Sequence, residues 1–282
     1  MTTSVTQTSL MPMVIAAVEH RRAAESRLLA DELALQMLPA PMRPLLRQRI
    51  VGRWLTTSMD RREPGVWNSL ACRKRYLDDV VSASVRDGVQ ALVVLGAGLD
   101  TKAARLAAPA GIPSFEVDLP INIARKHRRM RLPDNVTQVP FDFEHHGLGA
   151  ALAQHGYRAD ATTMFVWEGV TQYLTEPAVR AVLQVLADSP TGSRLAFSYI
   201  CKDFLDGIDF HGAEQTYRRF VGDGRTWRFG LRPSSVPALL AEYGWREREQ
   251  VGPKEYTVRY LDPAERATTI TGLERCVSAD KD

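Results

Sequence analysis

The sequence is poor in cysteine, and its three cysteines are far apart. Cys72, Cys201 and Cys276 form no Cys-x-x-Cys pair within the 282 residues. An odd, scattered set argues against a disulfide framework and against a zinc site, and it favours a reducing compartment. His145 and His146 are adjacent but have no further ligand residues around them, so we expect no metal. The expected location is the cytoplasm.

Long apolar runs and a strong charge imbalance are also missing. No stretch approaches the ~20 apolar residues of a membrane-spanning helix. The apolar run at residues 11–18 is too short for a signal peptide and is followed by charged residues. A net charge of +3 does not by itself indicate nucleic-acid binding. The basic run at residues 125–131 is interpreted as a solvated helix end. We therefore expect neither a membrane nor a nucleic-acid partner.

Strand-like and helix-like segments alternate through the middle of the chain. With 45% hydrophobic residues, the sequence can bury a sizeable core. Helical spacing of apolar residues comes first, at residues 12–37, 45–56 and 68–86. Strands are then predicted at residues 91–95, 113–117, 136–139, 161–167 and 193–200, and helices between them at residues 119–130, 148–155 and 176–188. This alternation predicts an α/β fold, with a mostly parallel sheet covered by helices on both faces.

The alternation stops after the fifth predicted strand. Residues 203–232 are rich in glycine, arginine and aromatic residues, and they are either a lid over the substrate or a packed surface insertion. The pattern then predicts a helix at residues 234–243, strands at 245–251 and 255–260, and a final helix at 262–276. The predicted domains are an N-terminal helical cap at residues 1–66 and a catalytic domain at residues 67–282 that carries the lid-like insertion.

A glycine turn follows the first predicted strand, with the sequence Leu95-Gly96-Ala97-Gly98-Leu99-Asp100-Thr101. Glycine lets a ligand lie against the backbone, and the helix that follows offers free N–H groups. A dinucleotide site needs a third glycine where this chain has Thr101, so a nicotinamide or flavin cofactor is disfavoured. Asp118 ends the second predicted strand, about 20 residues on, where a carboxylate accepts hydrogen bonds from ribose hydroxyls.

Several motifs together resemble the leucine carboxyl methyltransferase family, and more closely its bacterial branch of small-molecule O-methyltransferases. They are the glycine turn, Phe115-Glu116-Val117-Asp118-Leu119-Pro120, Asp142, the segment Trp167-Glu168-Gly169-Val170-Thr171-Gln172-Tyr173-Leu174, and residues 73–79. The resemblance covers roughly residues 73–200. It implies S-adenosylmethionine as the cofactor and a Rossmann-like class I methyltransferase fold. The sheet of that fold has seven strands and an antiparallel last strand, for which residues 255–260 are the candidate.

The resemblance also implies which residues line the cofactor. They are, from its methionine end to its adenine, Arg73, Glu168, Gly96, Ala97, Gly98, Asp118, Leu119, Asp142 and Phe143. Arg73 suits the methionine carboxylate, because a guanidinium fork matches a carboxylate. Glu168 follows the fourth strand, at the edge of the sheet where ligands of open α/β sheets lie. Three of these residues have a structural alternative, which is a solvated helix charge for Arg73, a turn residue after Pro140 for Asp142 and a helix-capping carboxylate for Glu168.

Tyr173 and Glu168 are the candidate catalytic residues. An aromatic face favours a cation such as the sulfonium, although Tyr173 could equally pack in the core. The sequence offers no convincing general base, and a carboxylate acceptor needs none because it is ionised at neutral pH. We therefore expect a small-molecule carboxylate or acidic hydroxyl as acceptor, in secondary metabolism. Four arginines in the insertion are candidates to hold an anionic acceptor, namely Arg218, Arg219, Arg225 and Arg228.

Two other functions are compatible with the same motifs. In the first, S-adenosylmethionine is itself the substrate, and its amine attacks its own γ-carbon to give azetidine-2-carboxylate and methylthioadenosine. In the second, the protein is a non-catalytic binding protein on a methyltransferase fold, which is disfavoured because the expected cofactor residues are all present. Partners beyond the small molecules are not indicated, apart from a possible second copy in a homodimer.

Overall fold

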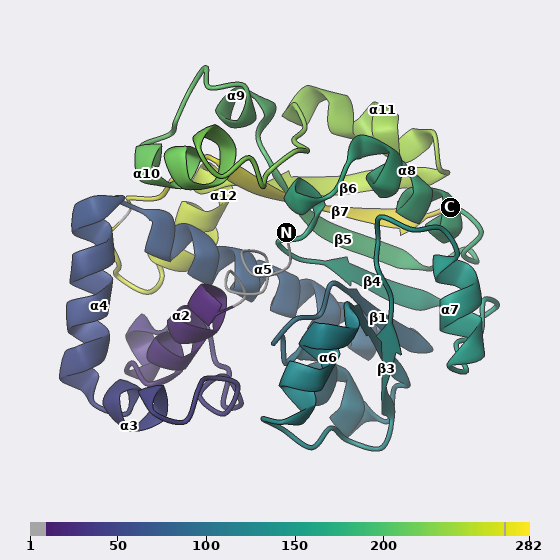
Figure 1. The fold of residues 1–282 in the computed structure, drawn as a ribbon, viewed down its shortest axis with the longest axis horizontal. Coiled ribbons are helices and arrows are strands. Elements are labelled where there is room, and N and C mark those ends of the chain that lie inside the picture. Colours follow the sequence, from purple (N-terminus) through teal and green to yellow (C-terminus); the bar gives the residue numbers. More distant parts are fainter. Residues whose placement is uncertain (1–9, 268) are drawn as a thin grey trace.

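A seven-stranded sheet forms the centre of the molecule (Figure 1). The computed structural model describes residues 10–267 and 269–282. The strands are β1 (Ala91–Leu95), β2 (Ser114–Asp118), β3 (Val136–Pro140), β4 (Thr163–Trp167), β5 (Arg194–Ile200), β6 (Trp245–Val251) and β7 (Glu274–Lys281). Their order across the sheet is β3-β2-β1-β4-β5-β7-β6. Strands β1 to β5 are parallel, and β7 runs antiparallel to both β5 and β6. The predicted α/β fold and the five parallel strands are confirmed.

The C-terminal region differs from the prediction in two places. Residues 255–260 are helical, because α12 (Pro253–Tyr256) continues into a further helical segment at Thr257–Leu261. Pro253 stands in the first turn, and the Glu255 carboxylate accepts a hydrogen bond from the Gly252 N–H at 2.8 Å. These helix-start contacts override the β propensity of the tyrosines, valine and threonine there.

The final helix predicted at residues 262–276 is also wrong, and the antiparallel strand of the sheet is β7 instead. Cys276, Val277 and Ala279 are buried because β7 has a strand on each side and helices above and below it. A strand that is buried on both faces shows little alternation of polar and apolar residues, so the pattern of β7 is not diagnostic.

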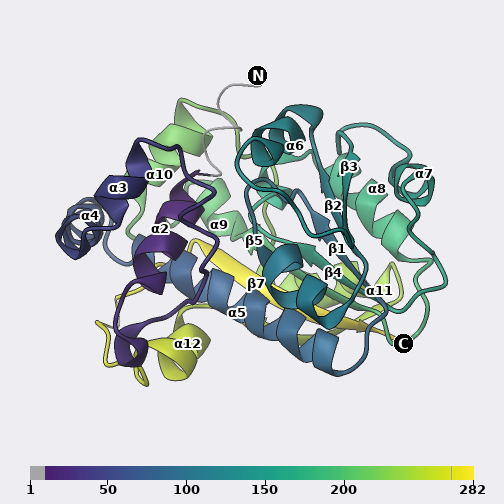
Figure 2. The same cartoon turned by 90° about the horizontal axis from the view of Figure 1, so that it is seen from below.

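The core has one layer on each face of the sheet. Leu92 and Val94 of β1 point into a cluster with α2 and α5, whereas Val93 and Leu95 point into a cluster with α7, α8 and α11. Figure 2 shows these two sets of helices on opposite faces of the sheet. The helices are α2 (Leu10–His20), α5 (Val66–Arg86), α7 (Leu148–Gln154), α8 (Glu176–Leu186) and α11 (Val236–Ala241). Helix α6 (Pro120–His127) connects β2 to β3.

The N-terminal helices pack on α5. Helix α2 ends at His20, and the chain then runs through turns to α3 (Met42–Leu46) and α4 (Arg49–Arg62). The buried Glu19 carboxylate of α2 accepts a hydrogen bond from the Trp67 indole of α5 at 2.7 Å. Residues 1–9 of the predicted cap lie outside the described residues, and the division at residue 66 stays a prediction. Within the described ranges, no helix is long and apolar enough to cross a membrane.

Candidate functional site

The carboxyl ends of parallel strands β1 to β4 bring the predicted cofactor residues to one edge of the sheet (Figure 1). The glycine turn follows β1, Asp118 ends β2, Asp142 lies two residues beyond β3, and Glu168 follows β4. Arg73 reaches this edge from α5. In open α/β sheets this edge is where ligands bind, so the topology assembles the site from segments that are far apart in the chain.

The glycine turn is shaped by its neighbours. Gly96 has φ of +69°, and a Cβ added there would lie 2.3 Å from Cγ2 of Val170, so the position requires glycine. The Gly96 N–H donates to the Val117 carbonyl at 2.8 Å. The Gly98 N–H donates to the Asp118 carboxylate at 2.5 Å. Ala97 is buried between these two glycines. The turn is thereby fixed to the end of β2.

The Asp118 carboxylate accepts three hydrogen bonds at this edge. In addition to the bond from Gly98, it accepts hydrogen bonds from the Leu119 N–H and from the Asn122 side-chain amide, both at 2.7 Å. Its residue exposure is only 8%. Burial raises the pKa of Asp118, and the hydrogen bonds oppose that rise only in part. Three donors therefore fix the carboxylate in position beside the glycine turn.

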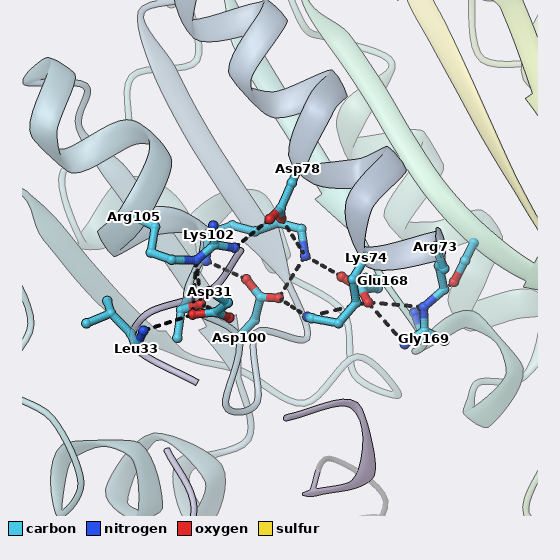
Figure 3. A network of polar contacts seen from close by, with 12 residues as sticks. Asp31, Leu33, Arg73, Lys74, Asp78, Asp100, Lys102, Arg105, Glu168 and Gly169 are labelled. Carbon is cyan, nitrogen blue, oxygen red and sulfur yellow. Dashed lines mark hydrogen bonds and ion pairs between the residues drawn. The ribbon is translucent and has the colours of Figure 1, made fainter. Parts of the chain in front are cut away.

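Arg73 and Glu168 are in direct contact (Figure 3). The Nε and Nη2 atoms of Arg73 lie 3.0 Å from Glu168, and Nη1 lies 2.8 Å from Glu274, the first residue of β7. The predicted ligand of the cofactor's carboxylate is therefore not a solvated charge. All three nitrogens of its guanidinium contact carboxylates. Gly169, with φ of +65°, lies beside this pair, and a Cβ there would approach Arg73 to 3.5 Å.

A buried network of ion pairs extends from Glu168 away from Arg73. Lys102 contacts Glu168 and also lies 2.8 Å from Asp100 and 3.6 Å from Asp78. Lys74 lies 3.1 Å from Asp100 and 3.7 Å from Glu168. Both lysines are buried, with exposures of 0% and 2%. The carboxylates therefore replace the water that these ammonium groups would otherwise need.

The far end of the same network reaches the N-terminal region (Figure 3). Arg105 lies 2.7 Å from Asp78 and 3.2 Å from Asp31, which is fully buried. The Thr101 hydroxyl donates to Asp31 at 2.7 Å. Thr101, the residue that replaces a third glycine, thus ties the glycine turn to residues before α3.

The network holds more carboxylates than cations. Its described members are the cations Arg73, Lys74, Lys102 and Arg105 and the carboxylates Asp31, Asp78, Asp100, Glu168 and Glu274. Burial raises the pKa of Glu168, but Lys102, Lys74 and Arg73 outweigh it and lower that pKa to about 2. For Asp78 burial prevails and its pKa is raised, and its Oδ1 has no hydrogen-bond donor among the described residues.

The residues predicted at the adenine and acceptor ends are less closely joined to this network. The Asp142 carboxylate, about half exposed, accepts a hydrogen bond from the Glu144 N–H of its own loop. Phe143 is buried against Trp167 with ring centroids 6.3 Å apart, and Phe141 next to it is more exposed. Tyr173 makes an edge contact with Trp227 at 6.4 Å. Direct contact therefore joins Arg73 to Glu168 and Gly98 to Asp118, and the other predicted roles stay predictions.

The aromatic residues of the insertion at 203–232 mostly contact one another. Trp227 stacks on Phe220 at 4.8 Å and lies 6.0 Å from Phe204, in the short helix α9 (Lys202–Leu205). Arg228 lies 2.6 Å from Glu144, and its Nη2 also donates to the Tyr173 carbonyl at 2.7 Å. Of the four arginines predicted to hold an acceptor, Arg228 is thus occupied in joining the insertion to the loops after β3 and β4.

Sequence reasoning missed most of the ion network. Lys74 and Asp78 are four residues apart on α5 and so share a face of the helix, which was the one available signal. Lys102 follows the glycine turn directly, but a lysine at a helix start is normally solvated. Glu274 lies 201 residues from Arg73 and could not be connected to it without the fold.

The strand order and the antiparallel seventh strand define the class I methyltransferase fold, and solved structures agree with it. A DUF574 family protein from Streptomyces avermitilis superimposes with a TM-score of 0.59 over 82% of this chain and 91% of its own, at 14% identity. A proposed methyltransferase from Thermobifida fusca gives 0.57 over 82% and 88%, at 16% identity. At such low identity these similarities show a shared fold.

The family follows from the sequence. The model of the leucine carboxyl methyltransferase family matches residues 9–187. A proposed S-adenosyl-L-methionine-dependent methyltransferase from Parafrankia is 34% identical over 64% of this chain, and one from Mycobacterium avium is 28% identical over 82% of it. The matches span 58% of the Parafrankia protein, 65% of a Streptomyces coelicolor relative and 86% of the Mycobacterium avium protein. The chain belongs to the leucine carboxyl methyltransferase family, whose cofactor is S-adenosylmethionine.

Proposed function

We propose that this protein transfers the methyl group of S-adenosylmethionine to an oxygen of a small-molecule carboxylate or acidic hydroxyl, in secondary metabolism. One observation carries the proposal beyond family membership: Arg73, Glu168 and the turn-bound Asp118 stand at the same edge of the sheet. A guanidinium and two carboxylates there are complementary to a carboxylate, an ammonium and two ribose hydroxyls.

The residues at this edge fit S-adenosylmethionine in charge. Glycine at position 96 keeps the turn free of a side chain, since a Cβ there would lie 2.3 Å from Val170, and the Gly98 N–H holds the Asp118 carboxylate beside the turn. Among the described residues, five carboxylates of the buried network face four cations, and the Oδ1 atom of Asp78 accepts no hydrogen bond, although the Lys102 ammonium lies 3.6 Å from it. A cofactor with an ammonium and a sulfonium supplies positive charge to a network with an excess of carboxylates.

In this proposal each group has a stated role. Arg73 would hold the methionine carboxylate, Glu168 the ammonium, and Asp118 the ribose hydroxyls. Because all three nitrogens of Arg73 already contact carboxylates, the methionine carboxylate would share the five N–H donors of the guanidinium with Glu168 and Glu274. When bound, S-adenosylmethionine supplies a methyl group already activated by its positive sulfur. The protein then has to position the acceptor and exclude water.

The choice of an acidic acceptor rests on the groups available for proton removal. His211 follows β5, but its Nε2 lies 3.3 Å from Asp203 and its Nδ1 lies 3.5 Å from Asp209, so both ring nitrogens face carboxylates of its own loop. An acceptor that is ionised at neutral pH needs no general base. In the same proposal, Tyr173 contributes an aromatic face to the sulfonium or to the acceptor.

Product analysis by mass spectrometry tests the proposal. The protein is incubated with S-adenosylmethionine alone and then with a panel of carboxylic acids and phenols. S-adenosylhomocysteine and a methylated acid that form only with an acceptor are the expected products. Methylthioadenosine formed without an acceptor would overturn methyl transfer. Calorimetry adds a separate test, since failure to bind S-adenosylhomocysteine would refute the cofactor site itself.

A further inference from the structure

Helix α4 carries a row of arginines on the outside of the molecule. Both Figure 1 and Figure 2 place α4 at the outer rim, away from strands β1 to β3. Arg49, Arg53 and Arg61 are exposed, and none of them has a hydrogen bond or ion pair within residues 10–267 and 269–282. Arg49 and Arg53 are four residues apart, so they lie side by side on the helix surface and repel one another. Such unpaired cations weaken a helix unless a partner neutralises them.

The packing of α4 on α2 brings further arginines to the same place. Gly52 lies so close to α2 that a Cβ there would be 3.0 Å from Cγ1 of Val18. The start of the loop after α2 is held by Arg21, which donates to the Arg47 carbonyl at 2.7 Å, and by Arg22, which donates to the Thr56 hydroxyl at 3.1 Å. These bonds fix two arginines opposite Arg49 and Arg53, of which Arg22 is also paired with Glu19 at 3.0 Å.

A concave surface lies along this arginine row. One hollow of about 300 Å³ is lined mainly by Arg21, Arg22, Arg49, Arg53, Leu46 and Gln48. A second, of about 420 Å³, is lined by Arg49, Ile50, Arg53, Trp54, Thr57 and Arg61. The two share Arg49 and Arg53 and so form one surface, which we call the α4 groove.

The α4 groove combines cations with exposed apolar side chains. Trp54 is 66% exposed and Ile50 is 74% exposed, and both line the groove together with the free arginines. Exposed aromatic and arginine residues side by side are typical of binding surfaces rather than of solvated faces. The basic run at residues 125–131 is only partly a solvated face, which corrects the prediction: Lys126 is fully buried against Glu116 and Arg129 donates to the Met37 carbonyl, whereas Arg128 and Arg131 are exposed.

We propose that the α4 groove binds an acidic, amphipathic helix of a partner protein. Arg49 and Arg53 repeat at the spacing of one helical turn, which matches carboxylates repeating at the same spacing on a facing helix. Ile50 and Trp54 would receive its apolar side chains, as in other helix-in-groove complexes. A flat lipid surface fits a concave site poorly, since interfacial helices present a convex apolar face. The proposal is independent of methyl transfer.

A binding assay with the full chain and a labelled probe tests this. The probe is a helical peptide of about 15 residues with Glu at every fourth position and Leu beside it. Fluorescence anisotropy should show saturable binding that R49E/R53E weakens about tenfold or more, since opposite charges become like charges across the interface. Trp54→Ser should weaken it several-fold. The control R128E/R131E changes the net charge equally on a different basic surface and should change the affinity less than about twofold.

The same variants define the results that overturn the proposal. If R49E/R53E and R128E/R131E weakened peptide binding equally, the attraction would be non-specific. If the wild type showed no saturable binding, the α4 groove would not be a binding site for an acidic helix. Vesicles containing phosphatidylserine and a DNA duplex are tested in parallel. Tighter binding to either, lost in R49E/R53E, would assign the groove to that partner instead. Thermal unfolding of each variant excludes loss of fold, which these exposed positions are not expected to cause.

Discussion

Replacing Glu168 with Gln removes one charge from the centre of the buried network and leaves its shape nearly unchanged. The neighbouring cations hold the pKa of Glu168 at about 2, against a usual value of 4.5, although burial acts in the opposite direction. At about 1.4 kcal/mol per pH unit, this corresponds to a stabilisation on the order of 3 kcal/mol at pH 7. The side chain is 9% exposed, so solvent screens little of it. In a chain of this size the melting temperature should fall by roughly 5–10 °C.

The pH dependence gives the sharper test. A carboxylate whose pKa is lowered on folding stabilises the protein above its unfolded pKa, and this stabilisation is lost as pH falls through its folded pKa. The difference in melting temperature between wild type and Glu168→Gln should therefore be constant near neutral pH and shrink from about pH 4.5 downwards. A difference that stays the same down to about pH 3, or is absent at pH 7, would refute the electrostatic account.

Glu176→Gln is the matched control for this experiment. The Glu176 carboxylate also contacts an arginine, Arg180, at 2.9 Å, but its side chain is 60% exposed at the start of α8. Exposed pairs of this kind contribute about 0.3–0.5 kcal/mol, so its melting temperature should fall by no more than ~2 °C.

Three further predictions concern the same edge of the sheet. Asp118→Asn should weaken S-adenosylhomocysteine binding in calorimetry by roughly 10- to 100-fold, as expected for lost hydrogen bonds to a charged group. Burial raises the pKa of Asp118, so the affinity of the wild type for S-adenosylhomocysteine should begin to fall at a higher pH than an ordinary aspartate would give. Without ligand, the loss of the carboxylate charge in Asp118→Asn should not lower the melting temperature. Gly96→Ala should lower the melting temperature by several degrees, since the new Cβ would lie 2.3 Å from Val170 at a position with positive φ. If this variant bound S-adenosylhomocysteine as tightly as the wild type, the glycine turn would not be part of the cofactor site. Asp31→Asn should lower both the melting temperature and the cofactor affinity, because Arg105 and Thr101 lose a buried partner. If neither quantity changed, the contacts of the N-terminal region with Arg105 and Thr101 would have no role in the cofactor site.

The parts of the fold that could be predicted are those whose signal is local. Strands β1, β4 and β5 are largely apolar runs, and Gly98 and Asp118 stand just after β1 and at the end of β2. Their contact follows from the parallel sheet, because the carboxyl ends of neighbouring strands meet. The strand β7 (Glu274–Lys281) could not be predicted in this way, since its pattern fits a buried segment of either kind.

The ion network shows why the rest of the site was beyond the sequence. Lys102 and Asp78 are residue types that normally face water, and nothing next to them in the chain indicates burial. Their burial results from the packing of α5 on one face of the sheet, which places Asp78 beside Lys102. Glu274 reaches Arg73 only because β7 lies next to β5. The strand order therefore determines which residues form these ion pairs, whereas the local sequence pattern determines which segments form strands.

The position of β7 also sets an order of assembly. β6 (Trp245–Val251) comes before β7 in the chain, yet its only neighbour in the described sheet is β7. During synthesis, which proceeds from the N-terminus, β6 therefore has no strand to pair with until residues 274–281 have been made. The same residues deliver Glu274 to Arg73. Pairing of β6 and completion of the ion pairs around Arg73 thus both depend on the same strand, β7.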